Sequence, residues 1–370
     1  MINEFLIPPG FNDNVTFEAY VEHKYKNTII NYFKSNGFDL IKTPLVEFSN
    51  ENDDNNFIFS RKKNEDELKI RNDITPQIIR VASSRLSKKK RPLKLCYYGE
   101  VLRKKGSMLR PERQFLQVGA EIIGSSNLQA DTEIISSAFN SLTNIGIKNI
   151  TIEISSKIFL EVFFKKLKDK NLESLLKESI KIKDLKKCMS FLKNENSKTY
   201  LNNIFLCTGN FPVVEDKLHL IEVDSATKKE ILNIRNLIKS LENLNFENFN
   251  LDFTELVEKK YHEGLKFTFF AKNVRGEVAS GGRYKIINNS LEETATGFTC
   301  YMDTVLRAST FENLAKKILV PYSTSSDLKE KLIEEGYVLF SIFDKSVDLA
   351  KDAKEYGCSY YLKDLKVIKI

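Results

Sequence analysis

The stretch that decides the fold is LCYYGEVLRKKGSMLRPERQFLQVGAEIIG, residues 95–124. Its two ends, residues 95–98 and 115–123, are rich in the apolar and aromatic residues that strands favour. Between them, residues 103–113 form a polar and basic loop. Two strands joined by a loop of this length predict an antiparallel hairpin with a long connection, and we expect a sheet to be built around it.

The second strand of this hairpin has one polar face. Side chains alternate across a strand, so Gln117, Gly119 and Glu121 share one face. The opposite face is apolar and comprises Leu116, Val118, Ala120 and Ile122. A polar face in such a strand indicates either a sheet that lines a pocket or a solvated outer face. The strand alone does not separate these two interpretations.

The composition is that of an ordinary globular protein with a basic balance. The 370 residues are enough for two or three domains, and 42% of them are hydrophobic. The 57 Lys and Arg residues exceed the 50 Asp and Glu residues, which gives a net charge of +7. A basic charge can indicate a nucleic-acid partner. Here Lys, Asn and Ile are abundant along the whole chain, which favours a general compositional bias over a binding patch.

Several kinds of site are not expected. The five cysteines are scattered without a CxxC pair and the chain has only three histidines, so the sequence predicts neither a zinc site nor a disulfide framework. No cofactor is indicated. No apolar run is long enough to cross a membrane, and the N-terminus lacks the pattern of a signal peptide. We therefore expect a cytoplasmic protein without membrane contact.

The chain before the hairpin begins with a helix and two strands. Apolar residues at helical spacing predict a helix over residues 15–36, ended by Gly37 as a C-cap. Residues 38–44 then predict a strand that stops at a proline. A short strand is expected at residues 57–59, inside an Asn- and Asp-rich loop.

A second unit of strand and helix follows. Residues 68–76 predict a strand that runs into a turn, and residues 77–86 predict a helix. Thr75 suits the N-cap of this helix and Pro76 suits its first position. An N-cap role alone would explain why a threonine stands at position 75.

The chain after the hairpin changes character. A helix is expected over residues 131–142 and a strand over residues 150–154. The next stretch is rich in Lys, Leu and Asn and predicts a helical insertion, whose basic residues we interpret as solvated helix faces. The expected domains are a core of residues 1–155 and 251–315, a helical insertion of residues 156–250, and a small α/β segment of residues 316–370.

The small C-terminal segment alternates strands and helices. Apolar runs predict three strands, and helices are expected between them over residues 325–335 and 347–356.

The central hairpin resembles motif 2 of the class II aminoacyl-tRNA synthetases, in particular that of the histidyl enzyme. In that enzyme an arginine begins the loop and a phrase like RQFHQ-G-E ends it. Here Arg103 begins a loop of the same length and RQFLQVGAE, residues 113–121, ends it. The helix and strand of residues 15–44 resemble motif 1, which forms the dimer interface in that family. TGFTCYMDTVL, residues 296–306, stands where motif 3 lies.

This resemblance implies the fold. We expect an α+β fold of the class II aminoacyl-tRNA synthetase type, with an antiparallel sheet flanked by helices. It carries a helical insertion and a small α/β appendage, which is shorter than the anticodon-binding domain of the synthetase.

The resemblance also implies a pocket for histidine. Asp73 and Thr75 match the acid and threonine of an LRPEGT phrase that hold the ammonium group of histidine, and Tyr284 of SGGRY matches a tyrosine of the imidazole pocket. His262 replaces the second tyrosine of an RGLDYY phrase. The residues assigned to the pocket in this way are Asp73, Thr75, Arg103, Gln117, Glu121, Tyr261, His262 and Tyr284. Each also has a purely structural interpretation, such as a core aromatic for Tyr284.

The groups that handle ATP in the synthetase are altered. Lys105 stands at the place of the motif 2 glutamate, Thr304 at that of the motif 3 arginine, and Val257 at that of the RGLDYY arginine. Removing one such positioned charge typically costs about 100-fold or more in rate. The resemblance therefore implies that amino-acid adenylation is lost.

A chain with these features resembles the regulatory subunits of ATP phosphoribosyltransferase, which are paralogues of the histidyl enzyme. That resemblance implies a non-catalytic protein of histidine biosynthesis, required by a short-form catalytic subunit and responsible for feedback regulation by histidine. It also implies a homodimer within a hetero-oligomer, and tRNA binding is not expected. Two alternatives stay open: an authentic histidyl-tRNA synthetase, and another synthetase-like paralogue that binds an amino acid.

Overall fold

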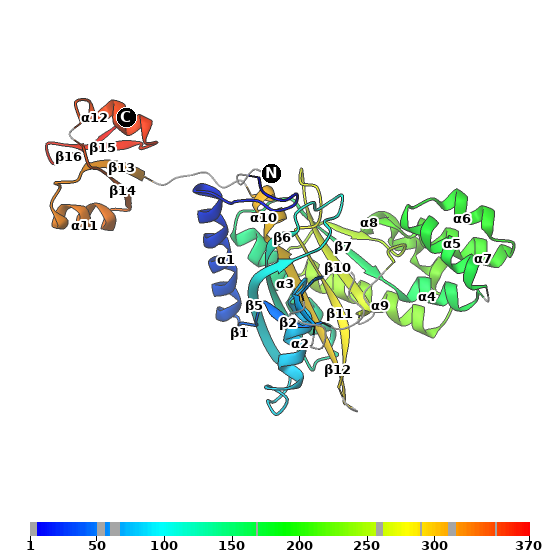
Figure 1. Ribbon diagram of the computed structural model, residues 1–370. Coiled ribbons are helices and arrows are strands. Elements are labelled where there is room, and N and C mark those ends of the chain that lie inside the picture. The colour runs from blue at the N-terminus through cyan, green and yellow to red at the C-terminus, as the bar shows by residue number, and fades with distance from the viewer. Residues whose placement is uncertain are drawn as a thin grey trace. The chain divides into compact units, whose positions relative to one another are not determined.

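The structure is a computed structural model that describes residues 6–49, 56–59, 67–167, 169–256, 262–288, 291–309, 316–344 and 346–370 (Figure 1). The chain divides into two compact units, Met1–Thr310 and Phe311–Ile370. The further division of the first unit into a core and an insertion stays a prediction.

A nine-stranded sheet organises the first unit, in the order β1-β5-β6-β12-β11-β10-β7-β9-β8. Neighbouring strands from β5 to β7 are antiparallel, whereas β1 pairs in parallel with β5, and β7 with β9. The predicted antiparallel sheet is therefore confirmed at its centre, with parallel pairs added toward its edges. The strands are β1 Asp39–Ile41, β5 Leu93–Leu102, β6 Gln114–Ile123, β7 Ile150–Ser156, β8 Gly209–Asn210, β9 Phe249–Leu251, β10 His262–Ala271, β11 Ala279–Asn288 and β12 Leu291–Tyr301.

Helices flank this sheet. Helices α1 (Phe17–Ser35) and α3 (Leu128–Asn144) contact its central strands and each other, and α10 (Met302–Ala308) contacts α1 (Figure 1). The ring of Phe33 on α1 meets the ring of Phe298 on β12 edge-on, at 5.6 Å between centroids. These contacts bury the apolar face of the sheet, so its polar face is left for a site.

Helix α2 (Thr75–Ser83) packs near the polar face. Ile74 and Ile78 join a buried cluster that includes Tyr97 of β5 and Tyr284 of β11. This apolar packing fixes the start of α2 beside the strands that carry the candidate site.

A small antiparallel sheet lies before α2, in the order β2-β4-β3. Its strands are β2 Val46–Phe48, β3 Phe57–Phe59 and β4 Leu68–Ile70. The buried Arg71 ties the end of β4 to the large sheet, since it donates to the carbonyl oxygens of Glu100 at 2.7 Å and Thr43 at 3.1 Å. At Gly99 a Cβ would lie 2.0 Å from the Arg71 guanidinium, so a side chain at this position would displace Arg71 from its hydrogen bonds.

Most of the chain between β7 and β9 is helical. Helix α9 is capped by Asp224, whose side chain accepts a hydrogen bond from the backbone N–H of Thr227. The helices are α4 Ile158–Lys165, α5 Lys170–Lys181, α6 Leu185–Phe191, α7 Glu195–Leu206, α8 Phe211–Val214, the 3₁₀ helix η1 Glu215–Ile221 and α9 Ser225–Glu242.

The second unit is a small α/β fold around a four-stranded sheet, in the order β14-β13-β15-β16. Its elements are β13 Lys316–Pro321, α11 Ser326–Glu334, β14 Tyr337–Ile342, α12 Leu349–Glu355, β15 Tyr360–Lys363 and β16 Lys366–Lys369. The predicted strands and helices are present. The hairpin between β15 and β16 was not predicted, because its turn residues Asp364 and Leu365 (φ 49° and 61°) are not the Asn-Gly type that marks such turns.

Candidate functional site

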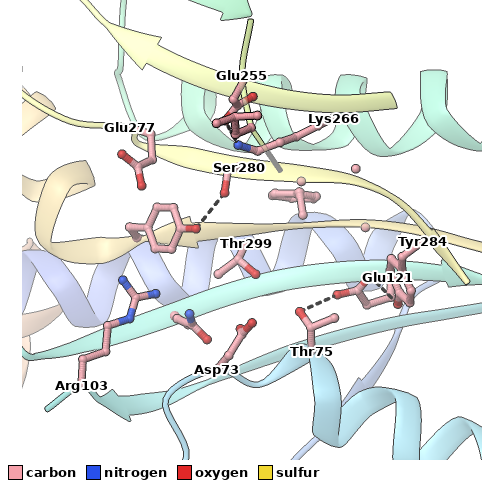
Figure 2. A pocket seen from close by; sticks show the side chains of 17 residues that line it. Asp73, Thr75, Arg103, Glu121, Glu255, Lys266, Glu277, Ser280, Tyr284 and Thr299 are labelled. Carbon is pink, nitrogen blue, oxygen red and sulfur yellow. Dashed lines mark hydrogen bonds and ion pairs between the residues drawn. The ribbon is translucent and has the colours of Figure 1, made fainter. Parts of the chain in front are cut away.

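A cavity of about 330 Å³ lies on the polar face of the nine-stranded sheet (Figure 2). It is bounded by β6, β10, β11, β12, the start of α2 and four connecting segments. The lining residues are Asp73, Thr75, Arg103, Gln117, Glu121, Glu255, Leu256, Lys266, Glu277, Ser280, Gly281, Gly282, Tyr284, Gly297, Phe298, Thr299 and Tyr301.

Strand register brings the polar groups together. Gly119 of β6 pairs with Thr299 of β12, Thr299 with Ser280 of β11, and Ser280 with Thr268 of β10. Directly paired residues share a face, so these positions form a row across the sheet. Glu153 of β7 continues the row beside Thr268. A polar floor thus crosses five strands that are far apart in the sequence.

The polar face of β6 belongs to this floor. Gln117 and Glu121 line the cavity, and each is only 1% exposed. The interpretation of β6 as a solvated outer face is therefore wrong, and its interpretation as a pocket-lining strand is confirmed.

Glu121 is the centre of a buried hydrogen-bond network. Its Oε1 accepts from the hydroxyls of Thr75 at 3.1 Å and Tyr97 at 3.3 Å, and its Oε2 accepts from the Tyr284 hydroxyl at 2.9 Å. Tyr97 also shares a 2.8 Å hydrogen bond with the Thr299 hydroxyl. Four elements are joined through this one carboxyl group, which fixes its position.

Burial changes the ionisation of this network. Desolvation raises the pKa of Glu121 to about 8, although the hydrogen bonds from Tyr284 and Thr75 oppose the shift. Desolvation also raises the pKa of Tyr97 well above its usual value. At neutral pH Glu121 is therefore mainly a neutral acid that can both donate and accept a hydrogen bond.

Thr75 acts in this network and does not cap α2. The N-cap position is Ile74, without a side-chain cap, and Thr75 is the first helical residue. The predicted N-cap role of Thr75 is wrong because its hydroxyl bonds to Glu121 and Tyr97 instead. The backbone N–H of Ile74 donates to Gln117 Oε1 at 3.2 Å, so this end of α2 is satisfied by the sheet.

Two glycines make room for the network. A Cβ at Gly297 would lie 1.5 Å from Glu121 Oε2, and a Cβ at Gly119 would lie 2.5 Å from the Tyr97 hydroxyl. Neither position tolerates a side chain while Glu121 and Tyr97 stay where they are.

The other end of the cavity carries charges of both signs. Figure 2 shows Arg103 and Glu277 there, away from Glu121 and Tyr284. The Arg103 guanidinium lies 4.9 Å from the centroid of the Phe115 ring. On a neighbouring wall Lys266 forms an ion pair with Glu255.

The structure brings together six of the eight predicted pocket residues, namely Asp73, Thr75, Arg103, Gln117, Glu121 and Tyr284. Tyr261 lies outside the described residues. His262 begins β10, where its backbone pairs with that of Tyr284, but its side chain is not described. That these residues bind histidine stays a prediction.

The three positions altered relative to the synthetase are found in different surroundings. Lys105 is exposed on the hairpin loop, while Thr304 is fully buried in α10. The Thr304 hydroxyl donates to Asp303 at 3.3 Å and accepts from Arg307 at 3.1 Å. Val257 lies outside the described residues.

Sequence reasoning missed several lining residues. Ser280 could have been found, since it lies four positions before Tyr284 on the same face of β11. Glu255, Lys266 and Glu277 carry no local sequence signal, because only the strand order brings them to the cavity.

The described part of the chain holds neither a cluster of metal-binding side chains nor a membrane-spanning helix. It contains no group of three or more His, Cys, Asp or Glu side chains arranged to hold a metal ion. None of its helices is long and apolar enough to cross a membrane.

The chain is similar to members of a known protein family. The model of the histidyl-tRNA synthetase family matches residues 10–305. An ATP phosphoribosyltransferase regulatory subunit of Rhodospirillum centenum is 29% identical, over 96% of this chain and 94% of the relative. A protein of the same name from Clostridium botulinum is 27% identical, over 98% of this chain and 95% of the relative.

Solved structures agree on the fold. An ATP phosphoribosyltransferase regulatory subunit/histidyl-tRNA synthetase from Bacillus halodurans superposes with a TM-score of 0.79 at 21% identity, over 95% of this chain and 96% of the other. A histidyl-tRNA synthetase from Nostoc gives a TM-score of 0.78 at 19% identity, over 98% and 92%. The predicted class II synthetase-like fold is confirmed.

Proposed function

The chain belongs to the histidyl-tRNA synthetase family, and we propose that within this family it is a non-catalytic regulatory subunit of ATP phosphoribosyltransferase. Relatives that carry this name match it over nearly their whole length. In the proposed assembly the chain binds a short-form catalytic subunit, and histidine bound in the cavity regulates that subunit.

The observation that carries this proposal is that the cavity has groups suited to an amino acid, whereas the residues that handle ATP in the synthetase are altered. Arg103 offers a guanidinium suited to a carboxylate, and Asp73 offers a carboxylate suited to an ammonium group. At the other end Glu121 and its hydrogen-bonded partners suit the two nitrogens of an imidazole. The cavity volume of about 330 Å³ is at the small end of the range for small-molecule sites.

The charges of the cavity argue against ATP chemistry. Catalysis at a phosphate requires positive groups that neutralise charge in the transition state. Among the described lining residues the cations are Arg103 and Lys266, and Lys266 is already paired with Glu255. Glu277 lies at the same end of the cavity as Arg103 (Figure 2), and its carboxylate pairs with Arg110, which does not line the cavity. A triphosphate in this cavity would meet little net positive charge.

The arginine nearest to the motif 3 position is also engaged. Arg307 follows Thr304 by three residues, and its guanidinium pairs with Glu112 at 2.6 Å and with Asp303 at 3.6 Å. Arg307 could therefore take the place of the missing arginine only by breaking these two ion pairs.

A homodimer is the proposed building block. One face of the small sheet exposes Val46 and Phe48 of β2 and Phe59 of β3, and both phenylalanines pair with Leu68 of β4. Phe48 is 66% exposed, which is unusual for a residue of this kind. A second copy of the chain would cover this apolar face.

The proposal is tested by adding the purified chain to a short-form ATP phosphoribosyltransferase. We expect the chain to stimulate the transferase and histidine to reverse the stimulation. Histidine can do so only if its affinity differs between active and inhibited assemblies, and a typical coupling of about 1–3 kcal/mol corresponds to about 5–150-fold in affinity. Absence of any change in transferase activity over a range of stoichiometries would refute the regulatory role.

A second candidate function is aminoacylation, because the family model is that of the histidyl-tRNA synthetases. Histidine-dependent exchange of pyrophosphate into ATP measures adenylate formation directly. We expect no exchange above background from the chain alone. Measurable exchange would favour the synthetase over the regulatory subunit.

A further inference from the structure

Arg110, in the loop between β5 and β6, is buried although its side chain is charged. It is 3% exposed, and its guanidinium lies 3.6 Å from the centroid of the Tyr301 ring and 5.4 Å from that of Phe115. Two carboxylates surround it, with Nη2 at 2.5 Å from Glu277 and Nε at 3.6 Å from Asp303. A planar cation stacked on an aromatic face and held by two carboxylates is how proteins bind guanidinium ligands.

The groups that hold Arg110 also form the wall of the cavity. Glu277 and Tyr301 line the cavity, and the Tyr301 hydroxyl shares a 2.7 Å hydrogen bond with Ser280, another lining residue. Arg103 lies over the same Phe115 ring that Arg110 approaches. Arg110 itself does not line the cavity, so it acts on a bound molecule only through these neighbours.

The loop that carries Arg110 is compact. The backbone N–H of Arg103 donates to the carbonyl oxygen of Arg113 at 2.7 Å, and that of Ser107 donates to the carbonyl of Arg110 at 2.7 Å. A Cβ at Gly106 would lie 2.4 Å from the carbonyl oxygen of Pro111, so the two arms of the loop touch. These contacts connect the part of the loop that carries Arg110 with the part that carries Arg103.

We propose that Arg110 is a positioning residue of the cavity. Its guanidinium fills a slot formed by Tyr301, Glu277 and Asp303. It thereby holds Arg103 in place and neutralises the Glu277 carboxylate in the cavity wall. The inference rests on the proposed function to the extent that it takes histidine as the molecule bound. Without Arg110, the Glu277 carboxylate would face the carboxylate of the amino acid and would compete for Arg103.

The test compares Arg110→Ala with Arg110→Lys, Glu277→Gln and the double variant Arg110→Ala/Glu277→Gln. Histidine affinity is measured by isothermal titration calorimetry. We expect Arg110→Ala to weaken histidine binding by about 10-fold or more, and Arg110→Lys to restore little of it, because lysine lacks the planar fork. The double variant should bind more tightly than Arg110→Ala, since the unpaired carboxylate is gone. Lys104→Ala, an exposed charge change in the same loop, is the matched control.

Chemical rescue by free guanidinium distinguishes a specific guanidinium-binding slot from a general structural role of Arg110. Guanidinium at about 20 mM, far below the molar range in which it unfolds proteins, should raise the melting temperature of Arg110→Ala and restore its histidine affinity. Potassium at the same concentration should do neither. The unsubstituted protein and Lys104→Ala should not respond to guanidinium.

Each of these measurements either supports the proposal or overturns it. Unchanged histidine affinity in Arg110→Ala, or an affinity loss that guanidinium does not reverse, overturns the proposal. If Arg110→Ala does not fold, the proposal stands or falls with Arg110→Lys, which should fold and still bind histidine more weakly. If the unsubstituted protein binds no histidine, the proposed ligand is wrong, and the slot is then judged by the guanidinium-dependent rise in melting temperature alone.

Discussion

Replacing Glu121 by glutamine should change how the stability of the protein depends on pH. The Glu121 carboxyl has a pKa of about 8 in the folded protein, against its ordinary value of 4.5. Between these values the folded protein holds a proton that the unfolded chain has released. The contribution of Glu121 to the free energy of unfolding is therefore complete below pH 4.5 and is lost as the pH rises through 8, because the pKa of this carboxyl is raised in the folded state.

The size of the effect follows from the two pKa values. From pH 6 to pH 8 the free energy of unfolding should fall by about 2 kcal/mol through this one group. Glutamine has the shape of the neutral acid, with one acceptor oxygen and one donor, so Glu121→Gln should keep the hydrogen bonds of the network and lack this slope. Below about pH 4.5 the variant and the unsubstituted protein should be of similar stability. Near pH 6 the variant should be about 2 kcal/mol more stable, because only the unsubstituted protein has to take up a proton on folding.

Urea unfolding at a series of pH values measures this difference. Burial and the neighbouring Asp252 raise the pKa of Glu153 as well, to about 7, but Glu153 contributes equally to both proteins and cancels in the comparison. Glu178→Gln removes an exposed carboxylate of α5 and should leave the slope as it is in the unsubstituted protein. An unchanged slope in Glu121→Gln, or a loss of several kcal/mol already at pH 6, would show that Glu121 is ionised in the folded protein.

Three further predictions test the remaining parts of the site. Gly297→Ala should destabilise the protein by about 2 kcal/mol or more in urea unfolding, because its Cβ would lie 1.5 Å from Glu121 Oε2. Arg103→Ala should weaken histidine binding by about 10–100-fold in calorimetry without a matching loss of stability, whereas Lys104→Ala should not. Phe48→Asp should convert the proposed dimer to a monomer in light scattering at unchanged secondary structure; a dimer that persists would remove the small sheet from the interface.

Local patterns were enough to predict the central parts of the fold. The period of two in β6 placed Gln117 and Glu121 on one face, and the long loop with two apolar flanks predicted the β5–β6 hairpin. Helix α1 ends where Gly37 adopts a φ of +81°, as its C-cap pattern predicted. These features depend on residues close together in the sequence, so one sequence is sufficient to find them.

Other features depend on contacts that the sequence does not show. Lys266 meets Glu255 only because β10 and the segment after β9 lie on either side of β7. Thr75 is of a residue type that favours the N-cap position, but its hydroxyl instead donates to a tertiary partner, Glu121. In both cases a long-range pairing decides the outcome, and local propensity gives no information on it.

The raised pKa of Glu121 also makes a prediction about histidine itself. The free imidazole has a pKa of about 6.5, so between about pH 6.5 and 8 the free ligand is neutral and Glu121 holds the single proton. A complex with one proton shared between imidazole and carboxyl then forms without net proton exchange.

Outside that window binding must exchange a proton. Below about pH 6.5 the imidazolium has to lose one, and above about pH 8 the Glu121 carboxylate has to gain one, so the affinity should fall by about 10-fold per pH unit on either side. Calorimetry in buffers of different ionisation enthalpy reports these protons directly: release at about pH 5.5, none near 7 and uptake at about 9. The ammonium group of histidine also titrates on the alkaline side, but it does so equally with Glu121→Gln, so the difference between the two proteins belongs to Glu121. An alkaline limb identical in both would mean that histidine does not contact this carboxyl group.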